Sequence, residues 1–96
     1  MAQNQGNAIT TDKNAKFNVK VVYCGGWGYT GKFNQVKQVI LNYYPNAHIE
    51  GEKTPSKSGA FEIYVEEKLI FSKLKSNSFV QDYNKLIQDI KNLVEA

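Results

Sequence analysis

Apolar and polar residues alternate along residues 17–23, which is the pattern of a β-strand. The apolar positions of one face are Phe17, Val19, Val21 and Tyr23. Val22 on the opposite face is apolar as well, which favours a central strand covered on both sides. The same alternation predicts strands over residues 60–65 and 69–72. The connection at residues 66–68, Glu-Glu-Lys, predicts that these two form an antiparallel hairpin, although it contains no glycine or asparagine.

Two helices are predicted from apolar residues that recur at three- and four-residue steps. The first follows the initial strand, has about four turns, and ends before Pro45, because the residue before a proline is pushed out of helical geometry. Its apolar stripe is Phe33, Val36, Ile40 and Tyr43. The second helix lies near the C-terminus and has Ser78 as its candidate N-cap. Its apolar stripe is Val80, Tyr83, Leu86, Ile87, Ile90, Leu93 and Val94.

A short second strand is predicted over residues 47–50, and its helical crossover from the first strand makes the two parallel. Residues 51–59 then form a polar loop. The order β-α-β-β-β-α predicts an α/β (α+β) domain with one four-stranded mixed sheet and two helices. This single domain comprises residues 16–96. Residues 1–15 contain almost no large apolar side chains, so we expect them to form a flexible tail.

Composition narrows the function classes. The 96 residues, 42% of them hydrophobic, suffice for one small domain, and a single cysteine excludes an internal disulfide and favours a reducing compartment. No apolar run reaches the length of a signal peptide or a membrane span, so we expect a soluble cytoplasmic protein with no membrane partner. The net charge of +3 comes from 12 lysines spread among nine acidic residues, without arginine, so nucleic-acid binding is not expected.

The candidate chemistry lies in the turn after the first strand, Tyr23-Cys24-Gly25-Gly26-Trp27-Gly28-Tyr29. Glycines allow backbone conformations that a side chain would forbid. The helix that follows offers unpaired N–H groups and a partial positive charge at its N-terminus. The turn also holds the only cysteine, Cys24, and the only tryptophan, Trp27, of the chain. Three interpretations of this turn are open.

The first interpretation is phosphate or dinucleotide binding, because residues 26–31 match the pattern G-x-G-x-x-G between a strand and a helix. Glu50, at the end of the predicted second strand, lies about where that fingerprint needs an acid for a ribose hydroxyl. Against this, the bulky Trp27 stands between the first two glycines, and a dinucleotide fold needs further parallel strands rather than a hairpin. A lone match of this kind is a weak indication.

The second interpretation is thiol chemistry. A helix N-terminus favours the thiolate of Cys24, and the spacing from Cys24 to Trp27 is that of a C-x-x-C redox pair. Tryptophan has no thiol, however, so Cys24 cannot close a disulfide within its own motif. In the third interpretation both residues are structural: Cys24 is a small buried hydrophobe and Trp27 is an aromatic plug under the loop.

Residues 21–29, Val-Val-Tyr-Cys-Gly-Gly-Trp-Gly-Tyr, resemble the signature of the selenoprotein W family, in which a cysteine and a selenocysteine are separated by two small residues and followed by Gly-Tyr. Three later blocks resemble that family in the same order and spacing, namely residues 51–55 (GEKTP), 59–62 (GAFE) and 68–73 (KLIFSK). The resemblance covers about residues 17–96. Separate blocks in register are far more specific than one short motif.

The resemblance implies a thioredoxin-like fold and a small cytoplasmic redox protein linked to glutathione, as a redox partner or adduct, and to 14-3-3 adaptor proteins. It implies no bound cofactor and no metal, and we expect a monomer. Cys24 occupies the cysteine position of the family, and Trp27 falls where selenocysteine is expected. The glycine of the family's hairpin turn is absent at Glu66 and Glu67.

Two explanations account for Trp27. Selenocysteine is encoded by UGA, one base from the tryptophan codon UGG, and some translation systems read UGA as tryptophan; we favour this origin. The alternative is a divergent member that keeps the fold as a non-catalytic interaction module. In both cases redox cycling is impaired, because an indole offers only bulk and one N–H donor in place of a selenol. Cys24 remains able to form mixed disulfides, and we expect it to be partly exposed and reactive.

The supporting loop of the predicted site consists of Gly25, Gly26, Gly28, Thr54 and Pro55. A cis-proline loop commonly faces the redox motif in thioredoxin-like folds, which makes Thr54-Pro55 a candidate for that role, whereas an ordinary trans bond is the commoner state of such dipeptides. The single His48 has no cluster of cysteines or carboxylates at ligand spacing. It is therefore interpreted as a surface residue rather than a metal ligand.

Overall fold

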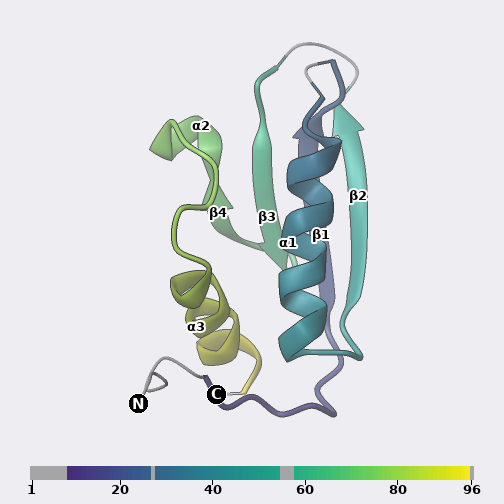
Figure 1. Ribbon diagram of the computed structural model, residues 1–96, viewed down its shortest axis with the longest axis vertical. Coiled ribbons are helices and arrows are strands. Elements are labelled where there is room, and N and C mark those ends of the chain that lie inside the picture. Colours follow the sequence, from purple (N-terminus) through teal and green to yellow (C-terminus); the bar gives the residue numbers. More distant parts are fainter. Residues whose placement is uncertain (1–8, 27, 55–57, 96) are drawn as a thin grey trace.

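The structure, a computed structural model, describes residues 9–26, 28–54 and 58–95 (Figure 1). In chain order its elements are β1 (Asn18–Cys24), α1 (Thr30–Tyr43), β2 (His48–Thr54), β3 (Phe61–Val65), β4 (Lys68–Ser72), α2 (Lys73–Ser76) and α3 (Tyr83–Val94). No helix within these described residues is both long enough and apolar enough to cross a lipid bilayer.

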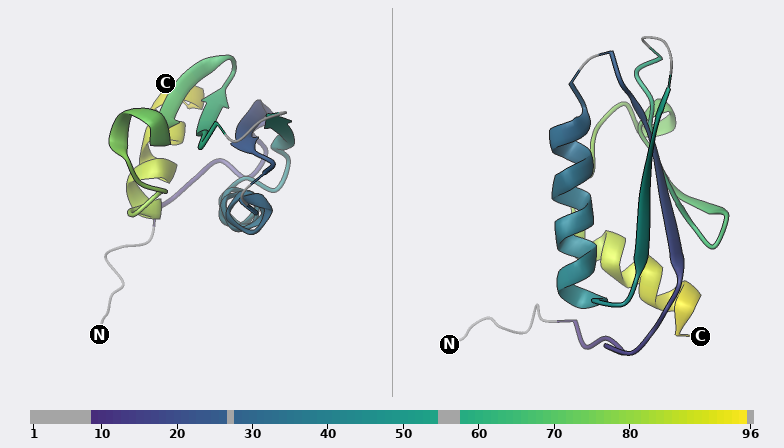
Figure 2. Two further views of the ribbon diagram at one scale, coloured as in Figure 1. Left: turned by 90° about the horizontal axis from the view of Figure 1, so that it is seen from above. Right: turned by 90° about the vertical axis from the view of Figure 1, so that its right-hand side faces the viewer.

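The four strands form one sheet in the order β2-β1-β3-β4. β2 runs parallel to β1, whereas β3 is antiparallel to β1 and β4 is antiparallel to β3. The predicted four-stranded mixed sheet is thus confirmed. Figure 2 shows α1 and α3 on the same side of the sheet, so the opposite face of β1 and β2 carries no long helix.

The hydrophobic core lies between the sheet and these two helices. β1 contributes the inward positions of its alternating pattern, and α1 and α3 contribute the middle of their apolar stripes. The residues with no measurable exposure in this core are Val21, Ile40, Tyr44, Phe61, Ile63, Val65, Ile87 and Ile90. The stripes predicted for both helices therefore face the sheet, as amphipathic helices do on a half-covered sheet.

The hairpin of β3 and β4 forms around a tight turn at Glu66 and Glu67. Both residues have left-handed backbone angles, with φ of 49° and 70°, which gives the turn the twist that short hairpins favour. The N–H of Glu66 donates to the carbonyl of Asn18 at 2.9 Å, and the N–H of Asn18 donates to the Glu66 carboxylate at 2.6 Å. The hairpin thus forms without the glycine or asparagine usual at such positions, at the cost of two strained residues.

β2 is longer than predicted, because residues 51–54 continue the strand instead of opening the polar loop. Their backbone pairs in register with β1 as far as Cys24 opposite Thr54. Gly51 belongs here for a steric reason: a Cβ at this position would lie 2.8 Å from the ring of Phe33 and 3.0 Å from that of Tyr23. A glycine that suggests a loop in the sequence is thus required by the packing of α1 on the strand.

The prediction of Ser78 as the N-cap of the last helix is wrong. α3 begins at Tyr83, and the side chain of Asp82 caps it by accepting a hydrogen bond from the N–H of Lys85 at 3.1 Å. Ser78 lies instead in the connection after α2, where its carbonyl accepts a hydrogen bond from the Ser76 hydroxyl at 3.1 Å. α2 itself is a short third helix that the apolar pattern does not predict.

The described part of the segment before β1 packs onto the domain. The Thr11 hydroxyl donates to the carbonyl of Tyr43 at 2.7 Å, and the N–H of Asp12 donates to the Glu95 carboxylate at 3.1 Å. Thr11 is buried. This part is therefore not the free tail that its composition predicts, because its polar groups bond to the ends of α1 and α3. The first eight residues lie outside the described residues.

Candidate functional site

The site is built around Cys24, the last residue of β1. In the parallel pair its Cα partner is Thr54, the last residue of β2. On its other side, the N–H of Cys24 donates to the carbonyl of Ala60 at 2.9 Å. Three segments of the chain thus meet at the cysteine, and the register places Thr54 of the predicted supporting loop beside it.

Cys24 is completely buried, with 0% of its surface exposed. The expectation of a partly exposed thiol is therefore wrong for this conformation. The reason is that hydrogen bonding to β1 continues past the start of β3, so that Gly59 and Ala60, both buried, close one side of the cysteine while β2 flanks the other. Reactive cysteines are usually partly exposed, so thiol chemistry at Cys24 requires a local opening.

The glycines after Cys24 fit the turn for two different reasons. A Cβ on Gly25 would lie 3.2 Å from the Cβ of Lys53 and 3.3 Å from the carbonyl oxygen of Thr54, so β2 leaves little room for a side chain. Gly28 has a φ of +72°, a conformation that L-residues rarely adopt. Gly26 is an exposed residue of the turn, whereas Trp27 and Pro55 lie outside the described residues.

Aromatic rings connect this turn to a distant part of the chain. The ring of Tyr29 meets that of Phe79 edge to face at 4.8 Å, and Phe79 meets Phe61 in the same way at 5.3 Å. Phe79 lies in the connection between α2 and α3, so the sequence separates it from the turn by about half the chain. Sequence reasoning missed Phe79, because only the folded topology places it beside the turn.

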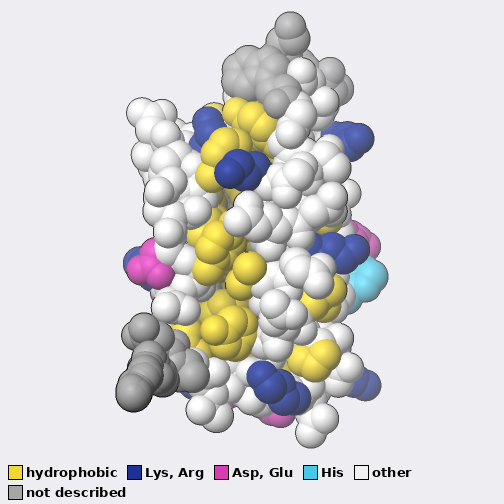
Figure 3. Space-filling model, viewed as in Figure 1, with side chains coloured by type: hydrophobic (Ala, Val, Ile, Leu, Met, Phe, Trp, Pro, Cys, Tyr) yellow, Lys and Arg dark blue, Asp and Glu magenta, His cyan; other side chains and the backbone are white. Residues whose placement is uncertain are grey.

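Two lysines lie over these rings. The Nζ of Lys73 is 5.7 Å from the ring centre of Tyr29 and 5.4 Å from that of Phe79, and the Nζ of Lys32 is 5.1 Å from Phe79. Figure 3 shows apolar side chains gathered along the seam between α1 and the α2–α3 half of the molecule, with basic side chains at its upper end. These cations give the surroundings of Tyr29 and Phe79 a positive charge, which favours an anion there.

The position of Lys73 depends on a buried carboxylate. Glu62 in β3 is 9% exposed and accepts a short hydrogen bond from the Ser72 hydroxyl. It also accepts hydrogen bonds from the N–H of Lys73 at 3.0 Å and of Leu74 at 3.4 Å. Glu62 therefore fixes the first turn of α2 to the sheet, and the sequence gives no local indication of this role.

The dinucleotide interpretation loses support. The third glycine of that fingerprint normally permits close packing of helix on strand, yet a Cβ on Gly31 would have nothing within 4 Å. The sheet also pairs β3 and β4 antiparallel instead of continuing with parallel strands. Glu50 is exposed and its carboxylate pairs with His48 at 3.1 Å. It is therefore not positioned to bind a ribose hydroxyl.

His48 is a surface residue, as predicted, with a side chain that is 66% exposed. Among the residues that the structure describes, no group of three or more histidine, cysteine or acidic side chains is arranged to hold a metal ion. The arrangement around Cys24 is instead that of a single thiol at the junction of a parallel strand pair, a glycine turn and an aromatic cluster with two cations.

Comparisons with known proteins identify the family and the fold of the chain. The model of the Rdx family matches residues 18–92. Selenoprotein W of Danio rerio is 42% identical over 78 residues, which cover 80% of this chain and 90% of that protein, and selenoprotein W of Macaca mulatta is 41% identical over 71 residues, which cover 73% and 82%. The crystal structure of a selenoprotein W-related protein from Vibrio cholerae shares the fold, with a TM-score of 0.71 at 17% identity over 82% of this chain and 98% of that one. The chain is a thioredoxin-like α+β protein and belongs to the selenoprotein W (Rdx) family.

Proposed function

We propose that this protein acts in cytoplasmic thiol redox chemistry through Cys24, with glutathione as its partner. The observation that carries the proposal is the place of Cys24 at the end of β1, directly before a glycine turn and a helix, in a chain about 40% identical to selenoprotein W. The cations Lys73 and Lys32 beside the turn support it, because positive charge favours the thiolate that attacks disulfides.

The proposed step is an exchange of thiol and disulfide. The Cys24 thiolate attacks one sulfur of glutathione disulfide, a bond forms between Cys24 and that glutathione, and the original S–S bond breaks. The second glutathione leaves as a thiolate and takes a proton from water. Cys24 is thereby oxidised and the departing glutathione is reduced.

The adduct has no internal route to resolution. In the family a second redox residue follows three positions after the cysteine, and Trp27 stands there in this sequence. An indole cannot attack a disulfide. The mixed disulfide on Cys24 therefore accumulates until an external thiol, such as a second glutathione, attacks it.

The direct test is incubation of the full chain with glutathione disulfide, followed by mass spectrometry. We expect one glutathione per chain, removed by reduced glutathione, and none on a Cys24→Ser control. A Trp27→Cys variant should form an internal disulfide with Cys24 and lose the adduct. The codon for residue 27 in the source gene tests the origin of the tryptophan separately: UGA supports replacement of selenocysteine, and UGG supports divergence.

A second candidate function is a non-catalytic interaction module, for example one that binds 14-3-3 proteins. The 0% exposure of Cys24 favours it, because a buried thiol reacts slowly. The same incubation separates the two. If native protein stays unmodified while urea-unfolded protein is modified fully, the redox proposal fails and the interaction module is preferred.

A further inference from the structure

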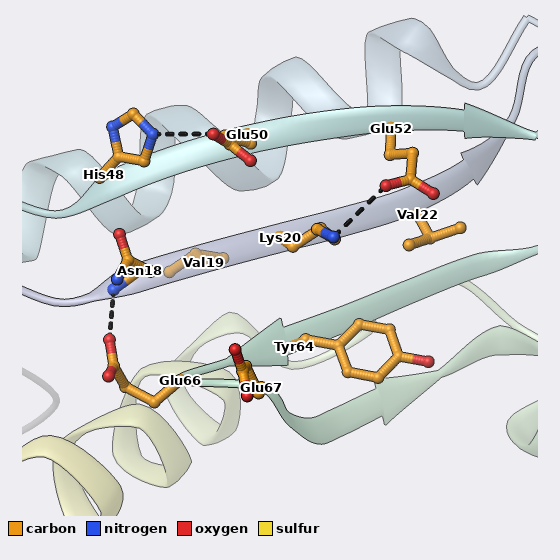
Figure 4. Close-up of a pocket in the computed structure, with 10 residues that line it drawn as sticks. All are labelled: Asn18, Val19, Lys20, Val22, His48, Glu50, Glu52, Tyr64, Glu66 and Glu67. Carbon is orange, nitrogen blue, oxygen red and sulfur yellow. Dashed lines mark hydrogen bonds and ion pairs between the residues drawn. The ribbon is translucent and has the colours of Figure 1, made fainter.

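The face of the sheet opposite α1 and α3 contains a hollow of about 820 Å³. It lies over the outward residues of β1 and β2 and is bordered by Tyr64 and the hairpin turn (Figure 4). The hairpin of β3 and β4 projects away from this face, as the side view in Figure 2 shows, and so forms one wall. We call this hollow the sheet trough.

The sheet trough is strongly acidic. Its lining contains four glutamates, Glu50, Glu52, Glu66 and Glu67, against a single lysine, Lys20. The whole chain, in contrast, has a net charge of +3, with 12 lysines and nine acidic residues. Four of the nine acidic residues of the chain, but only one of its 12 lysines, therefore line the trough.

The charges in the trough are only partly compensated from within. Lys20 pairs with Glu52 at 3.4 Å and His48 pairs with Glu50 at 3.1 Å, both at exposed positions. Within the described part of the chain, the carboxylate of Glu67 has no ion pair. Exposed pairs of this kind contribute little to stability, so these carboxylates remain available to a cationic partner.

The floor of the trough is not purely polar. Val22 in β1 and Tyr64 in β3 are half-buried and lie at the end of the trough away from the hairpin turn, whereas Asn18 and Lys20 lie between the carboxylates of β2 and those of the turn. Neighbouring strands place these groups about 5 Å apart across the sheet, and outward residues recur about 7 Å apart along each strand. An extended peptide that alternates basic and apolar side chains can therefore face the carboxylates with its basic groups and contact Val22 and Tyr64 with its apolar ones.

We propose that the sheet trough is the docking surface for an extended, lysine- or arginine-rich segment of another protein. The choice of occupant rests on charge complementarity and on the repeat of the strands, which matches an extended chain and not a helix. The proposal is independent of thiol chemistry at Cys24. A second copy of this chain is not the proposed occupant, because the sequence contains no long basic run that could lie in the trough.

The test is a binding titration with a fluorescent peptide of about nine residues, ~30 Å when extended, that alternates lysine and valine. A matched peptide that alternates glutamate and valine is the control for sequence and length. We expect saturable binding of the lysine peptide that weakens with added salt, and none of the glutamate peptide. Amide NMR shifts on the ¹⁵N-labelled protein should centre on Lys20, Val22 and Tyr64.

Two triple variants separate a specific site from general attraction. Glu50→Gln, Glu52→Gln and Glu67→Gln together neutralise the trough and leave Glu66, which bonds Asn18, in place. The control changes net charge equally on the far side of the sheet, at exposed positions of α1: Gln35→Lys, Gln38→Lys and Asn42→Lys. We expect at least about a tenfold loss of affinity in the first variant and less than about threefold in the second.

Each other outcome contradicts the proposal. Equal losses in the two variants mean that the peptide senses only net charge. Shifts centred on α1 or α3 mean that it binds another face. If spermine binds as tightly as the lysine peptide and produces the same shifts, the trough attracts any polycation and is not a peptide-docking surface.

Discussion

The hydroxyl of Tyr44 donates a hydrogen bond of 2.5 Å to the carboxylate of Glu95 and so joins the end of α1 to the end of α3. The same carboxylate accepts hydrogen bonds from Lys91 at 3.0 Å and from the N–H of Asp12 at 3.1 Å. Three segments, namely the one before β1, the end of α1 and the end of α3, are therefore held together by one side chain. Burial, followed by the bond to Glu95, raises the pKa of Tyr44, whereas the bonds from Tyr44 and then Lys91 lower the pKa of Glu95 to about 2.

The Glu95 contacts predict acid sensitivity. Because the pKa of Glu95 is about 2 in the folded protein against an ordinary 4.5, its contribution is complete above the ordinary pKa and is lost as the pH falls from there toward 2. In thermal unfolding, Glu95→Gln should lower Tm at about pH 6 and differ little from the parent at about pH 2. Asp89→Asn, which removes the i,i+4 ion pair with Lys85 in α3, is the control. A Tm difference that is the same at both pH values contradicts this account.

The hairpin turn predicts a stabilising substitution. Glu67 has a φ of 70°, which costs an L-residue about 1–2 kcal/mol that glycine does not incur. Glu67→Gly should therefore raise the free energy of unfolding by about 1 kcal/mol, measured by urea denaturation. Glu67→Ala is the matched control, since it removes the same carboxylate and keeps the strain; an equal gain in both variants would assign the effect to charge.

Two glycines predict opposite effects of the same substitution. Gly51→Ala places a Cβ 2.8 Å from the ring of Phe33, so we expect a loss of about 1–3 kcal/mol from overpacking. Gly31→Ala in α1 meets nothing within 4 Å and should gain up to about 1 kcal/mol, because alanine favours helix. Urea denaturation of both variants checks the pair. Equal destabilisation would show that the rings do not limit the space at Gly51.

The buried Glu62 predicts a local effect on α2. Glu62→Ala leaves the Ser72 hydroxyl and the N–H of Lys73 without their acceptor, so stability should fall by about 2 kcal/mol. Amide hydrogen exchange of Lys73 and Leu74 should accelerate more than that of α3. Glu62→Gln keeps one acceptor oxygen, so its stability should lie between that of the parent protein and that of Glu62→Ala. Uniform acceleration across the domain would mean that Glu62 supports the whole sheet and not α2.

The burial of Cys24 predicts slow alkylation that depends on local opening. Iodoacetamide should react with the native protein at least about a hundredfold more slowly than with the unfolded chain. Low urea concentrations, below the unfolding transition, should accelerate the reaction if the glycine turn opens by itself. A rate that rises only in the unfolding transition would mean that Cys24 is exposed solely by global unfolding.

The elements with one apolar face could be predicted from the sequence. β1 alternates and α1 repeats at helical steps, so local periodicity alone determines both. The hairpin also follows from alternation, because β3 and β4 lie close together in the chain. These predictions need no knowledge of partners distant in sequence.

The N-cap at Ser78 is a local miss, because Asp82 caps α3 through the N–H of Lys85, whereas the other misses depend on contacts between distant residues. The sequence places Gly51 in a loop, because the contact of the Phe33 ring with Gly51 forms only in the folded protein. It also suggests an accessible Cys24, because the hydrogen bond between the backbones of Cys24 and Ala60 is not visible in the sequence. Likewise, the glutamates of β2 and those of the hairpin turn are brought to one face only by the strand order β2-β1-β3. The thioredoxin-like topology could be named from the blocks of resemblance, but the burial of its thiol could not.

The excess of carboxylates in the sheet trough, on a chain whose net charge is +3, also gives the molecule a permanent dipole moment. The electric field of an approaching charged molecule orients such a dipole before the two molecules come into contact. The protein therefore enters an encounter with a cationic surface in a preferred orientation, with the bare strands foremost.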